Sequence, residues 1–301
     1  MSDLKKNVVN SLDRAHRKIN DKIKGRWPKV SLYFYTKPRA KWLYYKNERA
    51  LMKGMDVSTS DHQSVVFFSV HKAATMYVNS VLSKLSQAHG LLPIDYSGWF
   101  SSANSKMYEH YNDPEFMKTA FRPKGYYYGA LHQYRKIPSL ERFKTVIVLR
   151  DPRDVLVSHY YSVAFSHAMI NKGLMEKRKK ALEQTIDEYV LDLAPEMLQT
   201  YTEHVEHVIG KENVLFLTYE EMIKDLESWL RKIVAHTGLK EHPEVVQEIV
   251  ERSKFNKGTG EKKDHVRAAK AGDHAEKLKP DTIAQLNILF EPVMKYLGYP
   301  I

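Results

Sequence analysis

The sequence predicts an α/β fold, in which helices flank a central, mostly parallel sheet and a basic helical extension precedes it. Short continuous apolar runs, typical of strands buried on both faces, alternate with segments that suit helices. The 301 residues are enough to bury one large core. The net charge of +11 is concentrated in the first 61 residues, which hold 15 basic and 6 acidic side chains; 32 basic and 30 acidic side chains follow.

The N-terminal extension is predicted to begin with an amphipathic basic helix. Residues 4–24 place apolar side chains every three or four positions, with Lys and Arg between them. We expect this helix to end near Gly25 and Pro28. Aromatic and basic residues follow, and they either pack on the main domain or contact an anionic membrane surface. We divide the chain into this extension, residues 1–61, and one domain, residues 62–301.

Composition narrows the class of protein. The absence of cysteine excludes disulfides, thiolate metal ligands and a cysteine nucleophile, and it fits a reducing cytoplasm. No apolar run reaches the ~20 residues of a bilayer-spanning helix, and the first residues lack an apolar signal region. We expect a cytoplasmic protein, with peripheral membrane contact if the extension binds lipid. Nucleic-acid binding is not expected, because the main domain is nearly neutral.

The first predicted strand, residues 65–70, leads into a short loop and a helix over residues 76–85. The loop and the positive end of the helix dipole present backbone N–H groups to an anion, and Lys72 adds a full charge. The loop lacks the glycines and the G-K-[ST] ending of a nucleoside-triphosphate P-loop. By itself, this strand, loop and helix is a common arrangement.

A second strand is predicted over residues 125–131, and it ends before His132. A histidine suits proton transfer near neutral pH, so His132 is our first candidate for a general base. Two further candidates are His71, beside Lys72, and His159.

The third strand, residues 145–149, is followed by Arg150 and by Asp-Pro, which predicts a helix to about residue 163. An arginine at the end of a buried strand can grip a phosphate through two parallel hydrogen bonds. Ser158 lies about two helical turns further on. The alternative is an arginine that only forms a salt bridge with Asp151 or Asp154 at the start of the helix, with Ser158 on the surface.

The fourth strand, residues 214–217, precedes Tyr219 and a predicted helix over residues 220–236. Ligands bind beyond the carboxyl ends of parallel strands, so the residues after the four strands are expected to form one site.

Together these segments resemble the phosphosulfate-binding signatures of the sulfotransferase family. The loop S-V-H-K-A-A-T-M-Y resembles the family's P-K-S-G-T-T-W, with matches at Lys72 and Thr75 and an aromatic Tyr77 at the Trp position. The segment L-R-D-P-R-D-V-L-V-S-H-Y-Y carries the arginine and serine of the family's 3′-phosphate motif, here Arg150 and Ser158.

A third segment, residues 265–280, is similar to the family's R-K-G-x-x-G-D-W-K-N loop. It matches at Arg267, Gly272 and Asp273, whereas His274 stands at the Trp position. The first loop departs from the family by having Ala73, Ala74 and Met76 at its Ser, Gly and Thr positions.

The resemblance implies a P-loop-like sulfotransferase that moves a sulfuryl group from 3′-phosphoadenosine 5′-phosphosulfate to an acceptor hydroxyl or amine by in-line displacement. Adenosine 3′,5′-bisphosphate is then the product, and the chemistry needs no metal. The acceptor is a small molecule, a lipid or a carbohydrate. Lys72 and His132 are the implied catalytic residues. The implied donor-binding residues are Lys72, Ala73, Ala74, Thr75, Met76, Tyr77, Arg150, Ser158, Tyr219 and Arg267.

Other classes of protein stay open. A small-molecule kinase would show a glycine-rich triphosphate loop and a carboxylate for Mg²⁺, and neither is evident in the sequence. A non-catalytic nucleotide-binding or membrane-associated protein on the same fold is the stronger alternative, and the alanines of the first and third motifs favour it.

Overall fold

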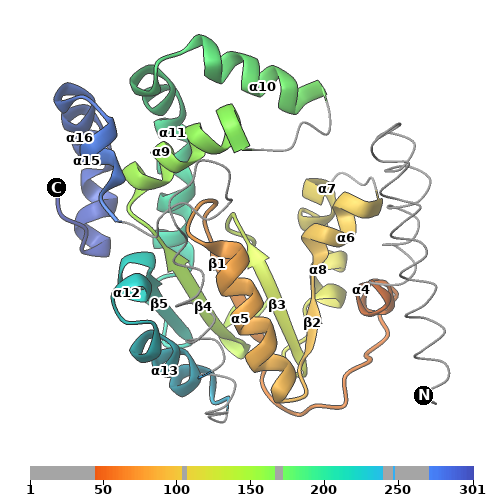
Figure 1. Cartoon of the computed structure of the whole chain (residues 1–301). Helices are drawn as coiled ribbons and strands as arrows, with labels where there is room; N and C mark the ends of the chain where they lie inside the picture. The colour runs from red at the N-terminus through yellow and green to blue at the C-terminus, as the bar shows by residue number, and fades with distance from the viewer. Residues whose placement is uncertain (1–44, 104–106, 167–171, 240–246, 248–270) are drawn as a thin grey trace.

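The computed structural model describes residues 45–103, 107–166, 172–239, 247 and 271–301. Its centre is a five-stranded sheet in which all strand pairs are parallel, in the order β2-β3-β1-β4-β5. Figure 1 shows helices on both sides of this sheet. The predicted α/β fold with a mostly parallel sheet is therefore confirmed. The strands are β1 (Val65–Ser69), β2 (Leu92–Ile94), β3 (Tyr126–Leu131), β4 (Lys144–Leu149) and β5 (Val214–Thr218).

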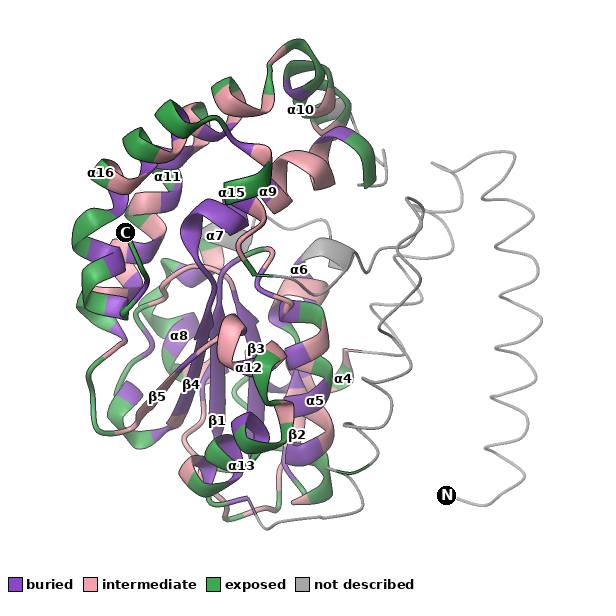
Figure 2. Cartoon of the chain, turned by 60° about the vertical axis from the view of Figure 1, so that its left-hand side comes forward, coloured by how far each residue is buried: buried purple, intermediate pink, exposed green. Residues whose placement is uncertain are grey.

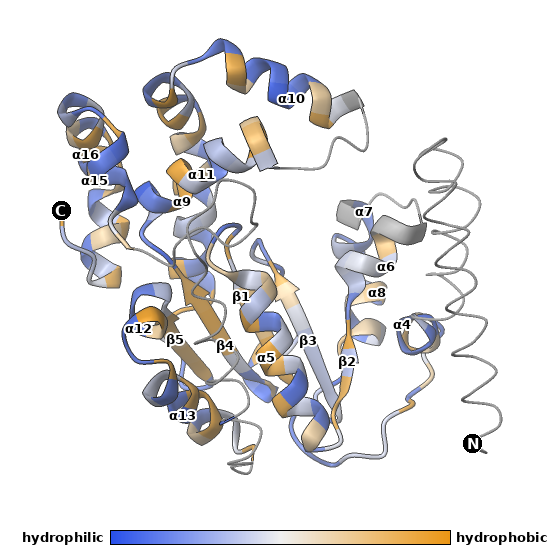
Figure 3. Cartoon of the chain, viewed as in Figure 1, coloured by the Kyte–Doolittle hydropathy of each residue, from blue (hydrophilic) through white to orange (hydrophobic). Residues whose placement is uncertain are grey.

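The sheet separates two hydrophobic cores, and alternate residues of β1 enter each. Val65 and Phe67 pack with α5, α12 and α13, whereas Val66 and Phe68 pack with helices of the opposite face, including α11 and α16. All four side chains are fully buried, as expected for a strand covered on both faces (Figure 2). Figure 3 shows apolar colouring on β4, which is also mostly buried, and on the edge strand β5, whose residues are mostly half-buried.

Helices connect the strands and close both faces. Their bounds are α4 (Lys46–Met52), α5 (Thr75–Ala88), α6 (Tyr96–Ala103), α7 (Met107–Tyr111), α8 (Pro114–Ala120), α9 (Pro152–Tyr161), α10 (Lys172–Glu183), α11 (Ile186–His207), α12 (Tyr219–Lys224), α13 (Leu226–Thr237), α15 (Asp273–Lys277) and α16 (Pro280–Leu297). A 3₁₀ turn, η3 (Leu140–Arg142), precedes β4, and a π-helical segment, η4 (Ser162–Ser166), continues α9.

The helix predicted over residues 220–236 is wrong as a single element. Asp225 interrupts it, because its side chain accepts a hydrogen bond from the Ser228 amide and caps α13. Thr218 and Glu221 form a capping box at the start of α12, so the two short helices each carry their own N-terminal signal.

The predicted N-terminal helix, residues 4–24, lies outside the described residues. Within the predicted extension, α4 packs on the main domain: Leu51 is fully buried, and Glu48 accepts a hydrogen bond from the Asp95 amide at 2.7 Å. In the part of the chain that the structure describes, no helix combines the length and apolarity that crossing a membrane requires.

Candidate functional site

The loop between β1 and α5 adopts a backbone that leaves the start of α5 open to a ligand. Lys72 and Ala74 have φ angles of 70° and 53°, in the left-handed region. Ala74 is the N-cap residue and makes no side-chain capping hydrogen bond. The first amides of a helix have no intrahelical acceptor, so an anion seated here would meet N–H groups and the positive dipole end of a 14-residue helix.

Thr75 closes the base of this loop. Its hydroxyl donates to the Val70 carbonyl at 2.8 Å and lies 3.1 Å from the Ser69 hydroxyl. Ser69 in turn donates to the Val148 carbonyl of β4 at 3.0 Å. The Thr75 side chain is therefore engaged with the end of β1, and it shapes the loop from inside the protein.

Arg150, which follows β4, lies against the same loop. Its Nη1 donates to the Lys72 carbonyl at 3.3 Å, and its side chain is 8% exposed. The guanidinium carbon lies 4.5 Å from the centre of the Tyr219 ring. The buried Tyr201 hydroxyl donates to the Arg150 carbonyl and fixes the backbone there. The structure thus brings together residues that follow β1, β4 and β5.

Asp154 connects Arg150 to the third motif. Its Oδ2 accepts from the Gly272 amide at 2.8 Å and lies 3.4 Å from Arg150 Nη2, and its Oδ1 accepts from the His274 amide at 3.0 Å. His274 Nδ1 lies 2.7 Å from the same Oδ1. Burial raises the pKa of Asp154, but these hydrogen bonds and the Arg150 charge outweigh it and lower the pKa to about 2. The carboxylate therefore stays ionised.

His132 directly follows β3, on the other side of β1 from Arg150. Its ring stacks on His71, with centroids 3.9 Å apart and planes 20° apart. Its Nδ1 is buried without a hydrogen-bond partner among the described residues. Burial is the main reason that the pKa of His132 falls to about 3, with smaller contributions from His71 and His204. The ring is therefore neutral at physiological pH, and in the absence of a ligand it binds a proton only weakly.

His204, on α11, lies behind His132 in the core. It is fully buried and packs edge-on against Phe68 at 5.9 Å. Burial lowers its pKa to about 4, and the nearby His132 backbone acts in the opposite direction, although neither ring nitrogen has a hydrogen-bond partner among the described residues. Two neutral histidines therefore lie together: His132 at the carboxyl end of β3, and His204 on α11 behind it.

For the remaining predicted site residues, no contact with Lys72 or Arg150 is described. Met76 is 82% exposed beside the loop, and Tyr77 is partly buried with its hydroxyl enclosed, which raises its pKa. Ser158 lies one turn beyond Asp154 on the same face of α9. Arg267 lies outside the described residues. His159 Nδ1 is 2.9 Å from the Tyr189 hydroxyl and so is held away from the loop.

The sequence interpretation gave no role to His204, named His274 only as a departure in the third motif, and named Asp154 only as an alternative salt-bridge partner of Arg150. A signal existed for Asp154, because the i,i+4 spacing from Arg150 on a helix favours an ion pair. Asp154, the partner of His274, lies 120 positions away in the chain, so no local sequence pattern predicts this contact.

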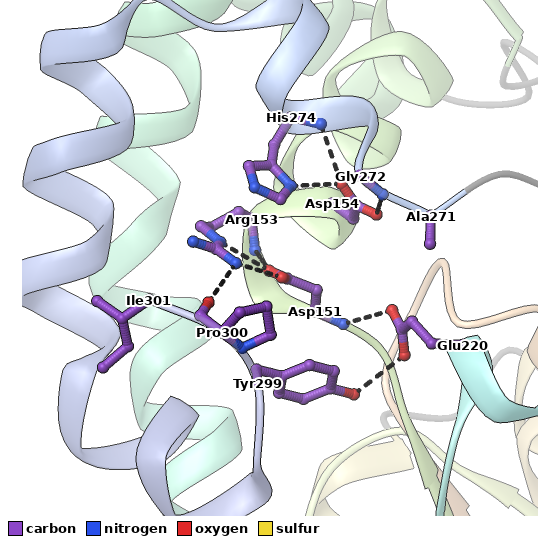
Figure 4. A pocket seen from close by; sticks show the side chains of 10 residues that line it. All are labelled: Asp151, Arg153, Asp154, Glu220, Ala271, Gly272, His274, Tyr299, Pro300 and Ile301. Carbon is purple, nitrogen blue, oxygen red and sulfur yellow. Dashed lines mark hydrogen bonds and ion pairs between the residues drawn. The ribbon is translucent and has the colours of Figure 1, made fainter.

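A cavity of about 340 Å³ borders this junction without forming part of the loop site (Figure 4). Three carboxylates line it, those of Asp151, Asp154 and Glu220, and burial raises the pKa of Glu220. Neither Lys72 nor Arg150 lines it. Its carboxylates make it a poor place for a phosphate, which leaves the loop and the Arg150 side of Asp154 as the candidate anion site.

Known proteins resemble this chain in sequence and in fold. The family model described as "Sulfotransferase domain" matches residues 130–298. A 3-beta-hydroxysteroid sulfotransferase of Cavia porcellus is 30% identical over 145 residues, which are 47% of this chain and 47% of that protein. A luciferin sulfotransferase of Photinus pyralis is 32% identical over 116 residues, 37% of this chain and 28% of that protein. The matched region thus spans about half or less of these relatives.

Solved structures share the fold over more of the chain. A mouse sulfotransferase complexed with PAP covers 82% of this chain and 88% of its own, with a TM-score of 0.52 and 18% identity. A retinol dehydratase in complex with retinol and PAP gives a TM-score of 0.52 at 16% identity, over 83% of this chain and 86% of its own. At these identities the likeness concerns the fold.

Proposed function

The chain belongs to the sulfotransferase family, and we propose that it moves a sulfuryl group from 3′-phosphoadenosine 5′-phosphosulfate to an acceptor hydroxyl or amine. One observation carries the proposal: Arg150 donates to the Lys72 carbonyl, and Asp154 ties Arg150 to Gly272. Hydrogen bonds thus connect the second of the three resembling motifs to the first, through Arg150, and to the third, through Asp154. A nucleotide with two separated phosphate ends needs such a set of cationic and amide groups.

The first loop is proposed to bind the 5′-phosphosulfate. The open amides at the start of α5 and the backbone of Ala73 and Ala74 would accept the anion, and Lys72 would supply charge to the leaving phosphate oxygen. Thr75 would act through its amide, since its hydroxyl is engaged with Val70. Met76 and Tyr77 would flank the loop on the first turn of α5.

The second and third motifs are proposed to bind the 3′-phosphate. Arg150 would contact it directly, with Ser158 and Arg267 as further donors. Tyr219 stacks on the Arg150 guanidinium at 4.5 Å and would hold it beside the adenine. Because Asp154 already neutralises part of the Arg150 charge, the phosphate would share that guanidinium with a carboxylate.

His132 is proposed to take the proton from the acceptor. A neutral imidazole is the form that accepts a proton, and burial keeps His132 in that form. An anionic donor bound beside it would favour the imidazolium and raise its pKa, so its proton affinity would increase when the donor is in place. Two of the relatives are named as sulfotransferases of a hydroxysteroid and of luciferin. We therefore propose a small molecule as the acceptor, ahead of a lipid or carbohydrate.

Calorimetric titration with adenosine 3′,5′-bisphosphate tests donor binding. We expect measurable binding by the unmutated chain and at least tenfold weaker binding by Lys72→Ala and by Arg150→Ala, since a charge-assisted hydrogen bond contributes about 1.5–3 kcal/mol. Arg231→Ala is a matched control, because Arg231 pairs with Glu227 on the surface of α13. No binding by the unmutated chain would refute the donor assignment.

Transfer of labelled sulfate to a panel of small hydroxyl acceptors tests catalysis. His132→Ala should lower the rate at least a hundredfold, the usual range for loss of a general base. Donor binding without transfer to any acceptor in the panel would favour the non-catalytic alternative.

A further inference from the structure

His71 stands in an unusual position for the loop that this chain resembles. It occupies the place before the lysine, where the family loop P-K-S-G-T-T-W has proline. The residue is exposed, yet its imidazole lies over one face of the less exposed His132 ring, with centroids 3.9 Å apart and planes at 20°. A flat ring in this position restricts how the His132 ring can rotate.

We propose that His71 is a positioning residue of the active site: its imidazole orients the ring of His132 and sets how readily that ring takes up a proton. The inference rests on the proposed function, in which His132 receives the proton of the acceptor. It extends that function by assigning a role to a residue that the donor site does not require.

The stacked geometry couples the two rings in two ways. As a flat surface, His71 holds the His132 ring in one orientation, with His204 behind it in the core. As an ionisable group, it opposes a second positive charge, because two imidazolium rings at this distance repel each other. Lys72 adds a further positive charge next to His71 in the chain. Among the described residues, the ionisable groups that act on His132 are His71, from the loop, and His204, from α11.

This coupling has a defined sign. A protonated His71 disfavours protonation of His132, and burial acts in the same direction. Replacement of His71 by phenylalanine keeps an aromatic surface and removes the charge, so the pKa of His132 should rise. A rate that needs neutral His132 should then begin to fall at a higher pH. Replacement by alanine removes the surface as well, and the orientation of His132 is lost.

The test measures His132 directly in the full chain. The ¹⁵N shifts of its ring nitrogens, assigned by their absence in His132→Gln, report its protonated fraction at pH 5. We expect that fraction to rise roughly threefold in His71→Phe, which corresponds to ~0.5 pKa unit. His89→Phe is the control, since His89 lies at the opposite end of α5 and should leave the His132 shifts unchanged.

The pH profile of kcat/KM provides the second measurement. The acid limb should move to higher pH in His71→Phe with kcat within about threefold of the unmutated chain, whereas His71→Ala should lose about tenfold in kcat with little change in donor KM. An unchanged protonated fraction of His132 in both variants would overturn the inference. If the unmutated chain transfers no sulfate, the proposed function fails, while the ¹⁵N measurement still decides whether His71 controls His132.

Discussion

Replacement of Asp154 by asparagine would test the junction that joins Arg150 to the third motif. The carboxylate is fully buried and receives hydrogen bonds from the Gly272 and His274 amides at 2.8 and 3.0 Å. An asparagine has the same shape, but its NH₂ group must replace one of the two oxygens. In either orientation, the NH₂ group of the asparagine would face the amide N–H of Gly272 or of His274, and two donors cannot form a hydrogen bond.

The expected cost follows from these contacts. The substitution removes a charge-assisted acceptor and leaves the Arg150 guanidinium, 8% exposed, without its carboxylate partner. Removing one partner of a buried ion pair costs about 3–5 kcal/mol. We take about 3 kcal/mol, because the pair at 3.4 Å is longer than an ideal one. For a domain of this size, that change lowers Tm by roughly 6–12 °C.

Guanidinium and thermal unfolding followed by circular dichroism would measure the effect. Asp192→Asn is the matched control: Asp192 pairs with Lys180 at the surface and should change stability by less than about 1 kcal/mol. We also expect Asp154→Asn to weaken adenosine 3′,5′-bisphosphate binding, since Arg150 would lose its fixed position. A loss of stability no larger than that of Asp192→Asn would refute the assigned role of Asp154.

Two further predictions concern buried histidine and loop strain. His204 has a pKa of about 4 in the folded chain against about 6.5 unfolded, so the unfolded state binds the extra proton and about 2 kcal/mol of stability should be lost between pH 7 and pH 5. His204→Leu should make the pH dependence of unfolding shallower by about that amount, and an equal slope would contradict it. Ala74→Gly should stabilise the chain by about 0.5–1 kcal/mol in denaturant titrations, because glycine adopts the φ of 53° without strain. Ala73→Gly, at a buried position without a left-handed φ, should destabilise it; equal losses in both variants would argue against strain at Ala74.

The strands that were predicted share one property. β1 and β4 each contain four consecutive apolar residues, 65–68 and 146–149, because both faces of the sheet are covered there, and such runs are visible without any knowledge of their partners. The edge strand β2 was missed, since it has three residues and contains Pro93. The 22-residue α11 was also missed, in a segment that the sequence analysis left without an assigned element.

The site could be predicted only where it depends on sheet geometry. That Lys72 and Arg150 lie together follows from adjacent parallel strands, whose carboxyl ends share one edge. The hydrogen bonds of Asp154 to Gly272 and His274 depend on how α9 and α15 pack, and packing between distant segments leaves no local signature. The low pKa of His132 likewise depends on packing, because burial is its main cause, with smaller contributions from His71 and His204.

The strand order has a consequence for the direction of chemistry. β3 and β4 flank β1 on opposite sides (Figure 1). His132, after β3, stacks on His71, and Arg150, after β4, donates to the Lys72 carbonyl, so the two residues border the loop from opposite sides. A displacement at sulfur requires the incoming and departing oxygens to lie on one line through the sulfur atom. A sulfuryl group centred over that loop would have the incoming nucleophile on the β3 flank and the nucleotide on the β4 flank. The order of the strands in the sheet would thus set the direction in which the sulfuryl group is transferred.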